Sequence, residues 1–125
     1  MSSEALLAAS RAFHPAVHKQ RPYAGAILTA RNLRRMWRGS SLIDSMKDKV
    51  QDAYSIRCTP QVIGAVRDTY EFVRAQVAVE LNSATDNPLI LIDPDEHEAL
   101  PDPYPANRAY SAGLFHGEPL GMAMD

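Results

Sequence analysis

The sequence has little cysteine and no long hydrophobic run. Its single cysteine, Cys58, excludes an internal disulfide framework and is typical of a protein in a reducing compartment. No apolar stretch approaches the roughly 20 residues that a membrane-spanning helix needs. The first residues also lack the basic and apolar regions of a signal peptide. We therefore expect a cytoplasmic protein without a membrane partner.

The sequence also lacks an excess of charge of either sign. Thirteen basic and 15 acidic residues give a net charge of −2, which provides no electrostatic reason to expect a nucleic-acid partner. Patterns of metal ligands are scarce as well. His14 and His18 are four residues apart, but Pro15 lies between them and no third ligand is evident. We expect neither a nucleic-acid partner nor a metal site.

The hydrophobic content of 46% and the charged content of 22% are ordinary for a globular protein, and 125 residues can bury a modest core. Ser3 is a suitable cap for a short helix that runs to about Ala12 and is broken before Pro15. A second helix is predicted between Pro22 and Gly39, because apolar residues recur there at helical spacing.

The strongest helical signal follows an irregular polar stretch. Thr59 is an acceptable N-cap, and Pro60 suits the first helical position. Apolar side chains then recur every three or four residues until about Asn82 and form one stripe, namely Val62, Val66, Tyr70, Val73, Val77 and Leu81. A helix of this length is more typical of a bundle than of a small independent domain.

The last third of the sequence predicts turns and loops. Asp86-Asn87-Pro88 is expected to form a turn, followed by a short strand at residues 89–92. Residues 93–108 contain four prolines and are expected to form a surface loop. A helix is predicted to begin at Leu120. Because the sequence stops just after this point, we expect a segment truncated at both ends.

Polar side chains are densest at residues 51–58, where an amide, a carboxylate, a phenol and a guanidinium fall within seven positions. A guanidinium can clamp a carboxylate with two hydrogen bonds, and a tyrosine can transfer a proton when its neighbours lower its pKa. Two interpretations stay open. The stretch is either a substrate-binding segment or a polar connector in which Arg57 pairs with Asp52.

Three motifs of the sequence carry a resemblance to a known family. The sequence QDAYSIRCTPQV at residues 51–62 resembles Q-D-x-Y-S-x-R-C-x-P-Q-V, a signature of the aromatic amino-acid ammonia-lyases. The sequence ELNSATDNPL at residues 80–89 is similar to E-L-N-x-x-T-D-N-P. The sequence FHGEP at residues 115–119 is similar to a stretch of the histidine branch. They occur in the family's order and at about its spacing, apart from a longer loop at residues 93–108.

The resemblance implies a mainly α fold, in which residues 1–125 form one partial segment of a long-helix bundle. It also implies irregular active-site loops, with at most a short strand near residues 89–92. Family members are homotetramers whose active sites draw on several subunits. They carry 4-methylidene-imidazol-5-one (MIO), an electrophile formed from an Ala-Ser-Gly tripeptide. The reaction implied is the removal of ammonia from L-histidine to give trans-urocanate.

Roles carry over by motif position. The resemblance implies that Arg57 holds the substrate carboxylate, that Tyr54 assists proton transfer beside the electrophile, and that Gln51 hydrogen-bonds nearby. It implies that Phe115 packs against the electrophile ring. His116 and Glu118 would support these groups rather than act on the substrate. No metal is implied.

The sequence also departs from the family pattern. It contains no Ala-Ser-Gly, so this chain cannot form the electrophile by itself. Leu114 stands where the family usually has an asparagine, which removes an amide hydrogen bond from the loop. Ala53 fits tyrosine ammonia-lyases at least as well as histidine ammonia-lyases. We expect the isolated chain to be inactive.

Three functions therefore stay open. The chain is a segment of a histidine ammonia-lyase, a segment of a tyrosine or phenylalanine ammonia-lyase or aminomutase, or a non-catalytic fragment. Its expected partners are an amino-acid substrate and either further copies of the chain or a complementary fragment.

Overall fold

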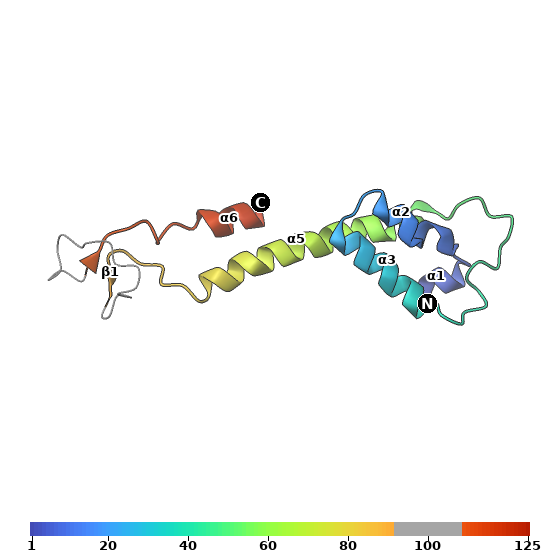
Figure 1. Cartoon of the computed structure of the whole chain (residues 1–125), viewed down its shortest axis with the longest axis horizontal. Coiled ribbons are helices and arrows are strands. Elements are labelled where there is room, and N and C mark those ends of the chain that lie inside the picture. Colours follow the sequence, from blue (N-terminus) through green and yellow to red (C-terminus); the bar gives the residue numbers. More distant parts are fainter. Residues whose placement is uncertain (92–108) are drawn as a thin grey trace. The chain divides into compact units, whose positions relative to one another are not determined.

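The computed structural model describes residues 1–91 and 109–125. The loop predicted at residues 93–108 and the end of the predicted strand at Ile92 lie outside the described residues. The described residues are mainly helical and fall into two compact units, Met1–Glu71 and Phe72–Asp125 (Figure 1). Each unit is described by itself.

The N-terminal segment differs from the single helix that the sequence predicted. It forms a short α-helix, α1 (Ser2–Ala5), and then a 3-10 helix, η1 (Ser10–Phe13). Leu7 lies between them with a φ angle of 51°, a left-handed conformation that a continuous α-helix does not contain. Ser3 does not cap this helix, because it lies inside α1; its hydroxyl oxygen accepts a hydrogen bond from the indole Nε1 of Trp37 at 2.9 Å.

Of the next two helices, the sequence predicted only the second, together with the break before the first. The chain is extended at His14, and α2 (Pro15–Lys19) begins at the proline, so the predicted break is confirmed. His14 caps α2, since its Nδ1 accepts a hydrogen bond from the backbone N–H of Ala16 at 3.2 Å. The predicted second helix is α3 (Ala24–Met36). Gly39 follows its end with a φ angle of +80°, which glycine adopts without strain.

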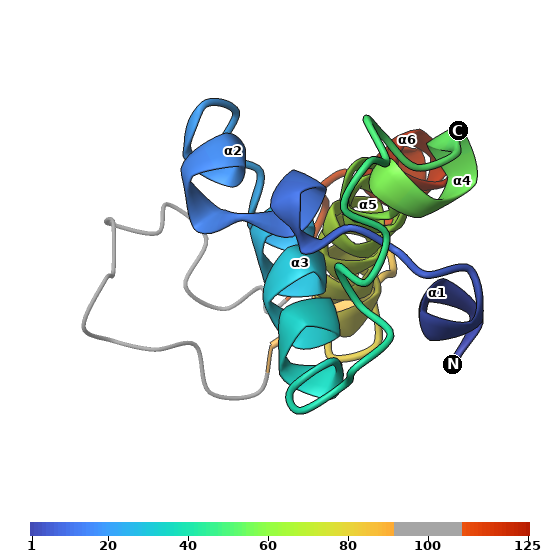
Figure 2. The same ribbon diagram turned by 90° about the vertical axis from the view of Figure 1, so that its right-hand side faces the viewer.

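The core of the first unit is built from η1 and α3. Phe13, Ala30 and Trp37 are buried together, and Ala12 and Leu33 pack against them. The Phe13 and Trp37 rings meet edge to face, with their centroids 4.7 Å apart. Figure 2 shows the residues after α3 returning along this unit to α4 (Tyr54–Arg57). This connector carries the dense polar stretch of the sequence.

The longest helix is α5 (Thr59–Glu80), which confirms the predicted long helix to within two residues at its C-terminal end. Thr59 is already helical, and its hydroxyl donates to the carbonyl of Ser55 at 2.7 Å instead of capping the helix. Most of the predicted apolar stripe is exposed in this chain, including 63% of Val66 and 79% of Leu81. The stripe therefore has few packing partners within the described residues.

Two glycines let α3 approach the first turns of α5. Gly25 and Gly64 are both buried. A Cβ atom at Gly25 would overlap the carbonyl oxygen of Gly64, and a Cβ atom at Gly64 would overlap the backbone of Ala26. Asp68 of α5 strengthens this contact, because its Oδ1 accepts the backbone N–H of Gly25 at 2.7 Å.

The second unit contains a small antiparallel sheet. The predicted strand is present as β1 (Leu89–Ile90), and it pairs with β2 (Ala109–Tyr110), with Leu89 opposite Tyr110. The side-chain oxygen of Asn87 accepts hydrogen bonds from the hydroxyl of Ser111 at 3.1 Å and the N–H of Ala112 at 2.8 Å. The final helix is α6 (Glu118–Met124), which begins two residues before the predicted start.

Among residues 1–91 and 109–125, the helices are too short or too polar to cross a membrane.

Candidate functional site

The first group of predicted site residues lies at α4. The Nε of Arg57 donates to the side-chain oxygen of Gln51 at 3.4 Å, and its Nη1 donates to the sulfur of Cys58 at 3.3 Å. The guanidinium carbon of Arg57 lies 5.5 Å from the centre of the Tyr54 ring. The structure thus brings together the three residues that the first motif assigned to substrate carboxylate binding and proton transfer.

Arg57 has no carboxylate partner within the described part of the chain. Its acceptors are an amide oxygen and a sulfur, which are weaker acceptors for a guanidinium than a carboxylate. The predicted alternative, in which Arg57 pairs with Asp52, is wrong. The neighbours of Arg57 therefore do not neutralise its positive charge. The charge is available to bind an anion.

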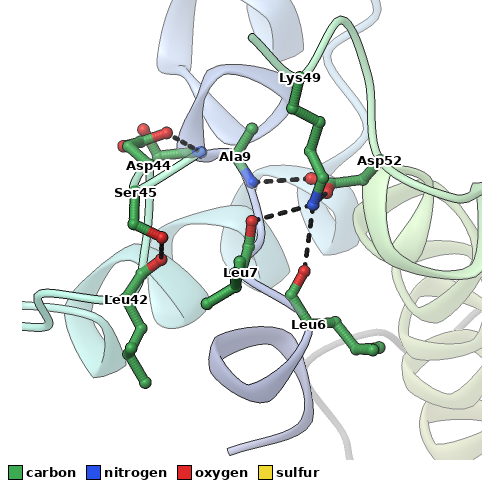
Figure 3. A network of polar contacts seen from close by, with 9 residues as sticks. Leu6, Leu7, Ala9, Leu42, Asp44, Ser45, Lys49 and Asp52 are labelled. Carbon is green, nitrogen blue, oxygen red and sulfur yellow. Dashed lines mark hydrogen bonds and ion pairs between the residues drawn. The ribbon is translucent and has the colours of Figure 1, made fainter. Parts of the chain in front are cut away.

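Asp52 instead joins this segment to the N-terminal turn (Figure 3). It is buried, with 6% of its surface exposed. Its Oδ2 accepts the backbone N–H of Ala9 at 2.7 Å, and its Oδ1 accepts Nζ of Lys49 at 2.7 Å. Lys49 also donates to the carbonyls of Leu6 at 3.0 Å and Leu7 at 2.9 Å. A buried carboxylate with an ion-pair partner and a backbone donor is fully accommodated.

A second carboxylate holds the other side of the same turn. Asp44 accepts the backbone N–H of Ser10 at 2.8 Å, and its own N–H donates to the carbonyl of Ala8 at 3.0 Å. The hydrogen bonds to Ser10 lower the pKa of the Asp44 carboxyl below its ordinary value. The turn is therefore held at two separate points of the connector.

The second group of predicted site residues lies at the start of α6. Nδ1 of His116 is 2.8 Å and 2.9 Å from the two carboxylate oxygens of Glu118, and the imidazole stacks on the ring of Phe115 with centroids 4.6 Å apart. The hydrogen bond from His116 lowers the pKa of Glu118. Leu114 lies beside this group with half of its surface exposed. These residues are held by one another within a short turn.

Comparison with known proteins places these motifs in a family. The profile of the family described as aromatic amino acid lyase matches residues 1–125. The chain belongs to the aromatic amino acid lyase family.

Individual relatives agree with this assignment. A histidine ammonia-lyase of Koribacter versatilis is 45% identical over the whole chain, which covers 25% of that protein. A tyrosine aminomutase structure from Streptomyces globisporus superposes with a TM-score of 0.76 at 34% identity, covering 98% of this chain and 25% of that one. A histidine ammonia-lyase structure from Trypanosoma cruzi gives a TM-score of 0.72 at 36% identity, covering 98% and 20%.

The chain spans about a quarter of the length of the curated relatives that it matches. Its mainly helical fold is that of the ammonia-lyase and aminomutase structures, as the sequence predicted. For this segment of an aromatic amino acid lyase, the α4 group and the α6 group are the candidate functional residues.

The two aromatic residues among the predicted site residues are accessible. Tyr54 exposes 66% of its surface and Phe115 exposes 57%. Neither ring is covered by its own hydrophobic core. Both rings are therefore free to make the contacts with MIO that the motif resemblance implies.

The structure also shows features that the sequence did not indicate. The Lys49–Asp52 ion pair is one of these features, because Lys49 lies outside the three motifs. Its carbonyl acceptors also have no fixed sequence spacing from it. A cavity of about 390 Å³ lies in the first unit of this lyase segment, with Arg21, Tyr23 and Asp68 in its lining, and it includes no predicted site residue. Nε2 of His18 and the hydroxyl of Thr29 are buried without a hydrogen-bond partner among the described residues.

Proposed function

We propose that this chain is a segment of a histidine ammonia-lyase, which removes ammonia from L-histidine and releases trans-urocanate. The observation that carries the proposal is the α4 group, in which the guanidinium of Arg57 lies beside Gln51 and Tyr54 without a carboxylate partner. A substrate carboxylate is the chemical group that such a guanidinium binds most strongly. The high identity to histidine ammonia-lyases favours histidine as the substrate.

Arg57 and Tyr54 would act on different parts of the substrate. Arg57 would bind the α-carboxylate and so fix the position of the Cα–Cβ bond. Tyr54 would lie beside that bond and exchange the proton that leaves the β-carbon. Gln51 would keep the guanidinium oriented through its amide oxygen. The products of the elimination are ammonia and the unsaturated acid, so one C–N bond and one C–H bond are broken.

The amino group is a poor leaving group and needs activation. MIO, formed from the family's Ala-Ser-Gly tripeptide, supplies an electrophile for this purpose when it is present. Because this chain contains no such tripeptide, the group would come from another part of the complete enzyme. Phe115 would pack against it, with His116 and Glu118 holding the phenylalanine in place.

The complete enzyme is proposed to be a homotetramer. The exposed apolar stripe of α5 supports this arrangement, since large exposed apolar surfaces mark protein–protein contacts. A central helix bundle would cover Val66, Tyr70 and Leu81.

The role of Arg57 can be tested on the complete polypeptide that carries this segment. We expect Arg57→Ala to lower kcat/KM for histidine about 10- to 100-fold, because a hydrogen bond to a charged group contributes about 1.5–3 kcal/mol. Arg38→Ala is a matched control, since Arg38 is an exposed arginine outside the site. Urocanate formation measured by absorbance gives the rates. Equal rates for Arg57→Ala and wild type would rule out the assigned role.

An alternative substrate is tyrosine or phenylalanine. The likeness to a tyrosine aminomutase structure and the presence of Ala53 in the first motif favour this candidate. Product analysis by chromatography with histidine, tyrosine and phenylalanine separates the possibilities. A β-amino acid product would indicate an aminomutase. Absence of turnover with all three amino acids would support a non-catalytic role, which Leu114 also favours.

A further inference from the structure

The segment that carries Tyr54 and Arg57 cannot fix its own orientation. α4 is a single helical turn of four residues, and so short a helix is not stable without outside contacts. Its N-cap, Ala53, has no side chain that could cap the turn. The directions of Tyr54 and Arg57 therefore depend on what holds the chain immediately before and after α4.

The C-terminal end of α4 is fixed by the long helix. The hydroxyl of Thr59 donates to the carbonyl of Ser55, and Pro60 at the start of α5 is fully buried. On this side, backbone and core packing hold the turn. The N-terminal end has no comparable core contact, because Gln51 and Ala53 are both exposed.

The one buried residue on the N-terminal side is Asp52. Its two carboxylate oxygens are divided between the N–H of Ala9 and the ammonium group of Lys49. A lysine ammonium has three N–H donors, and the carbonyls of Leu6 and Leu7 together with Asp52 provide three acceptors (Figure 3). Every donor of the ammonium group is therefore matched, and the ion pair bridges two segments that are about 40 residues apart in sequence.

The acceptor turn is itself in an uncommon conformation. Leu7 has a φ angle of 51°, which is unfavourable for a side chain other than glycine and persists only where neighbouring contacts maintain it. Its carbonyl is one of the acceptors of Lys49. The strained turn, the lysine and the buried aspartate thus form one unit directly before the candidate site.

We propose that Lys49 and Asp52 are positioning residues that hold Arg57 in the orientation needed to bind the substrate carboxylate. This inference rests on the proposed function of Arg57. Neither residue contacts the substrate; the pair fixes the start of α4 relative to the N-terminal turn. Breaking the pair frees the N-terminal end of α4, and the guanidinium then loses its fixed direction.

The test measures how much more tightly the complete enzyme binds an inhibitor with a carboxylate than a similar inhibitor without one. The probes are two competitive inhibitors, imidazolepropionate and ethylimidazole, which differ in the presence of a carboxylate. The inhibition constant of ethylimidazole is divided by that of imidazolepropionate, and this ratio is measured for wild type, Lys49→Met and Asp52→Asn. We expect both variants to lower this ratio about tenfold or more, since small misplacements of a binding group have large effects.

Asp44→Asn is the matched control. Asp44 holds the same N-terminal turn through Ser10, but it lies earlier in the connector than Lys49 and Asp52, which directly precede α4. We expect this variant to lose thermal stability and to keep the wild-type ratio. A merely structural role of Lys49 and Asp52 would make all three variants behave alike and would overturn the proposal.

Arg57→Ala separates the two hypotheses. If Arg57→Ala leaves the ratio unchanged, the proposed function of Arg57 is wrong. If Arg57→Ala removes the discrimination while Lys49→Met and Asp52→Asn retain it, the positioning role alone is wrong. Failure of both positioning variants to assemble would also overturn the inference, because it would assign the pair to folding.

Discussion

Single residues near the candidate site are held by charge and hydrogen bonds that reach across the chain. Asp52 takes its partners from Ala9 and Lys49, and Ser3 accepts the indole N–H of Trp37. At this scale the site depends on polar side chains that are buried together with their partners. A buried polar group without a partner is an exception to this pattern.

His18 is a partial exception, because its Nε2 has no partner among the described residues, and it predicts a pH dependence. Burial is the main cause that lowers its pKa below the ordinary value of 6.5; a backbone hydrogen bond with Ala12 opposes this shift, and the charge of Arg34 adds to it. The folded state thus binds this proton less readily than the unfolded state. The contribution of His18 to stability is fully present above pH 6.5, the ordinary pKa, and is lost progressively as the pH falls from there through the lowered pKa of the folded state.

The measurement is the thermal midpoint of the assembled enzyme between about pH 8 and about pH 5.5. We expect the midpoint of wild type to fall on acidification and that of His18→Gln to fall less. His14→Gln is the control, since His14 is exposed and caps α2. The same fall in wild type and His18→Gln would contradict the assignment.

At the scale of the elements, α3 approaches the first turns of α5 closely at two glycines. These are Gly25 and Gly64, which are buried where any side chain would overlap the opposite backbone. Asp68 then bonds the backbone N–H of Gly25. This contact joins the helical core to the helix that begins after the candidate site.

We expect Gly64→Ala to destabilise the protein by about 1–3 kcal/mol, because the added methyl group has no space and the backbone of α3 has to move. Gly121→Ala is the matched control. Gly121 lies in α6 with open space around its Cα, so alanine there should leave stability unchanged or raise it through its helix propensity. The free energy of unfolding from urea titration distinguishes the two. Equal effects of both substitutions would mean that the helices do not approach as closely as described.

At the scale of the whole molecule, the exposed apolar stripe of α5 is the main feature. Val62, Val66 and Tyr70 each expose at least half of their surface. In water such a surface favours association, because burial of apolar area releases about 25 cal/mol per Å².

We therefore expect the isolated chain to self-associate or to form a loosely packed state. Light scattering over a range of concentrations measures the association, and near-ultraviolet circular dichroism reports the packing. Replacement of Val66 and Tyr70 by glutamine should reduce the association. A sharply folded monomer at every concentration would contradict this expectation.

The sequence by itself determined the local elements. Pro15 marks the predicted break, Pro60 lies at the start of the long helix, and Gly39 follows a helix end. The periodic apolar residues predict α5, since helical spacing is a property of neighbouring residues. The motifs also placed Gln51, Tyr54 and Arg57 within reach of one another. Their spacing of three residues is again local information, with Tyr54 and Arg57 on α4 and Gln51 just before it.

Only the tertiary structure decided which distant groups pair. Asp52 faces Ala9 and Lys49 instead of Arg57, Ser3 bonds Trp37 instead of capping a helix, and Asn87 holds the chain at Ala112. Such pairs depend on which segments pack together, and the sequence contains no spacing rule for them. A carboxylate bonds whichever donor the folded chain brings to it, because an unpaired buried charge is costly.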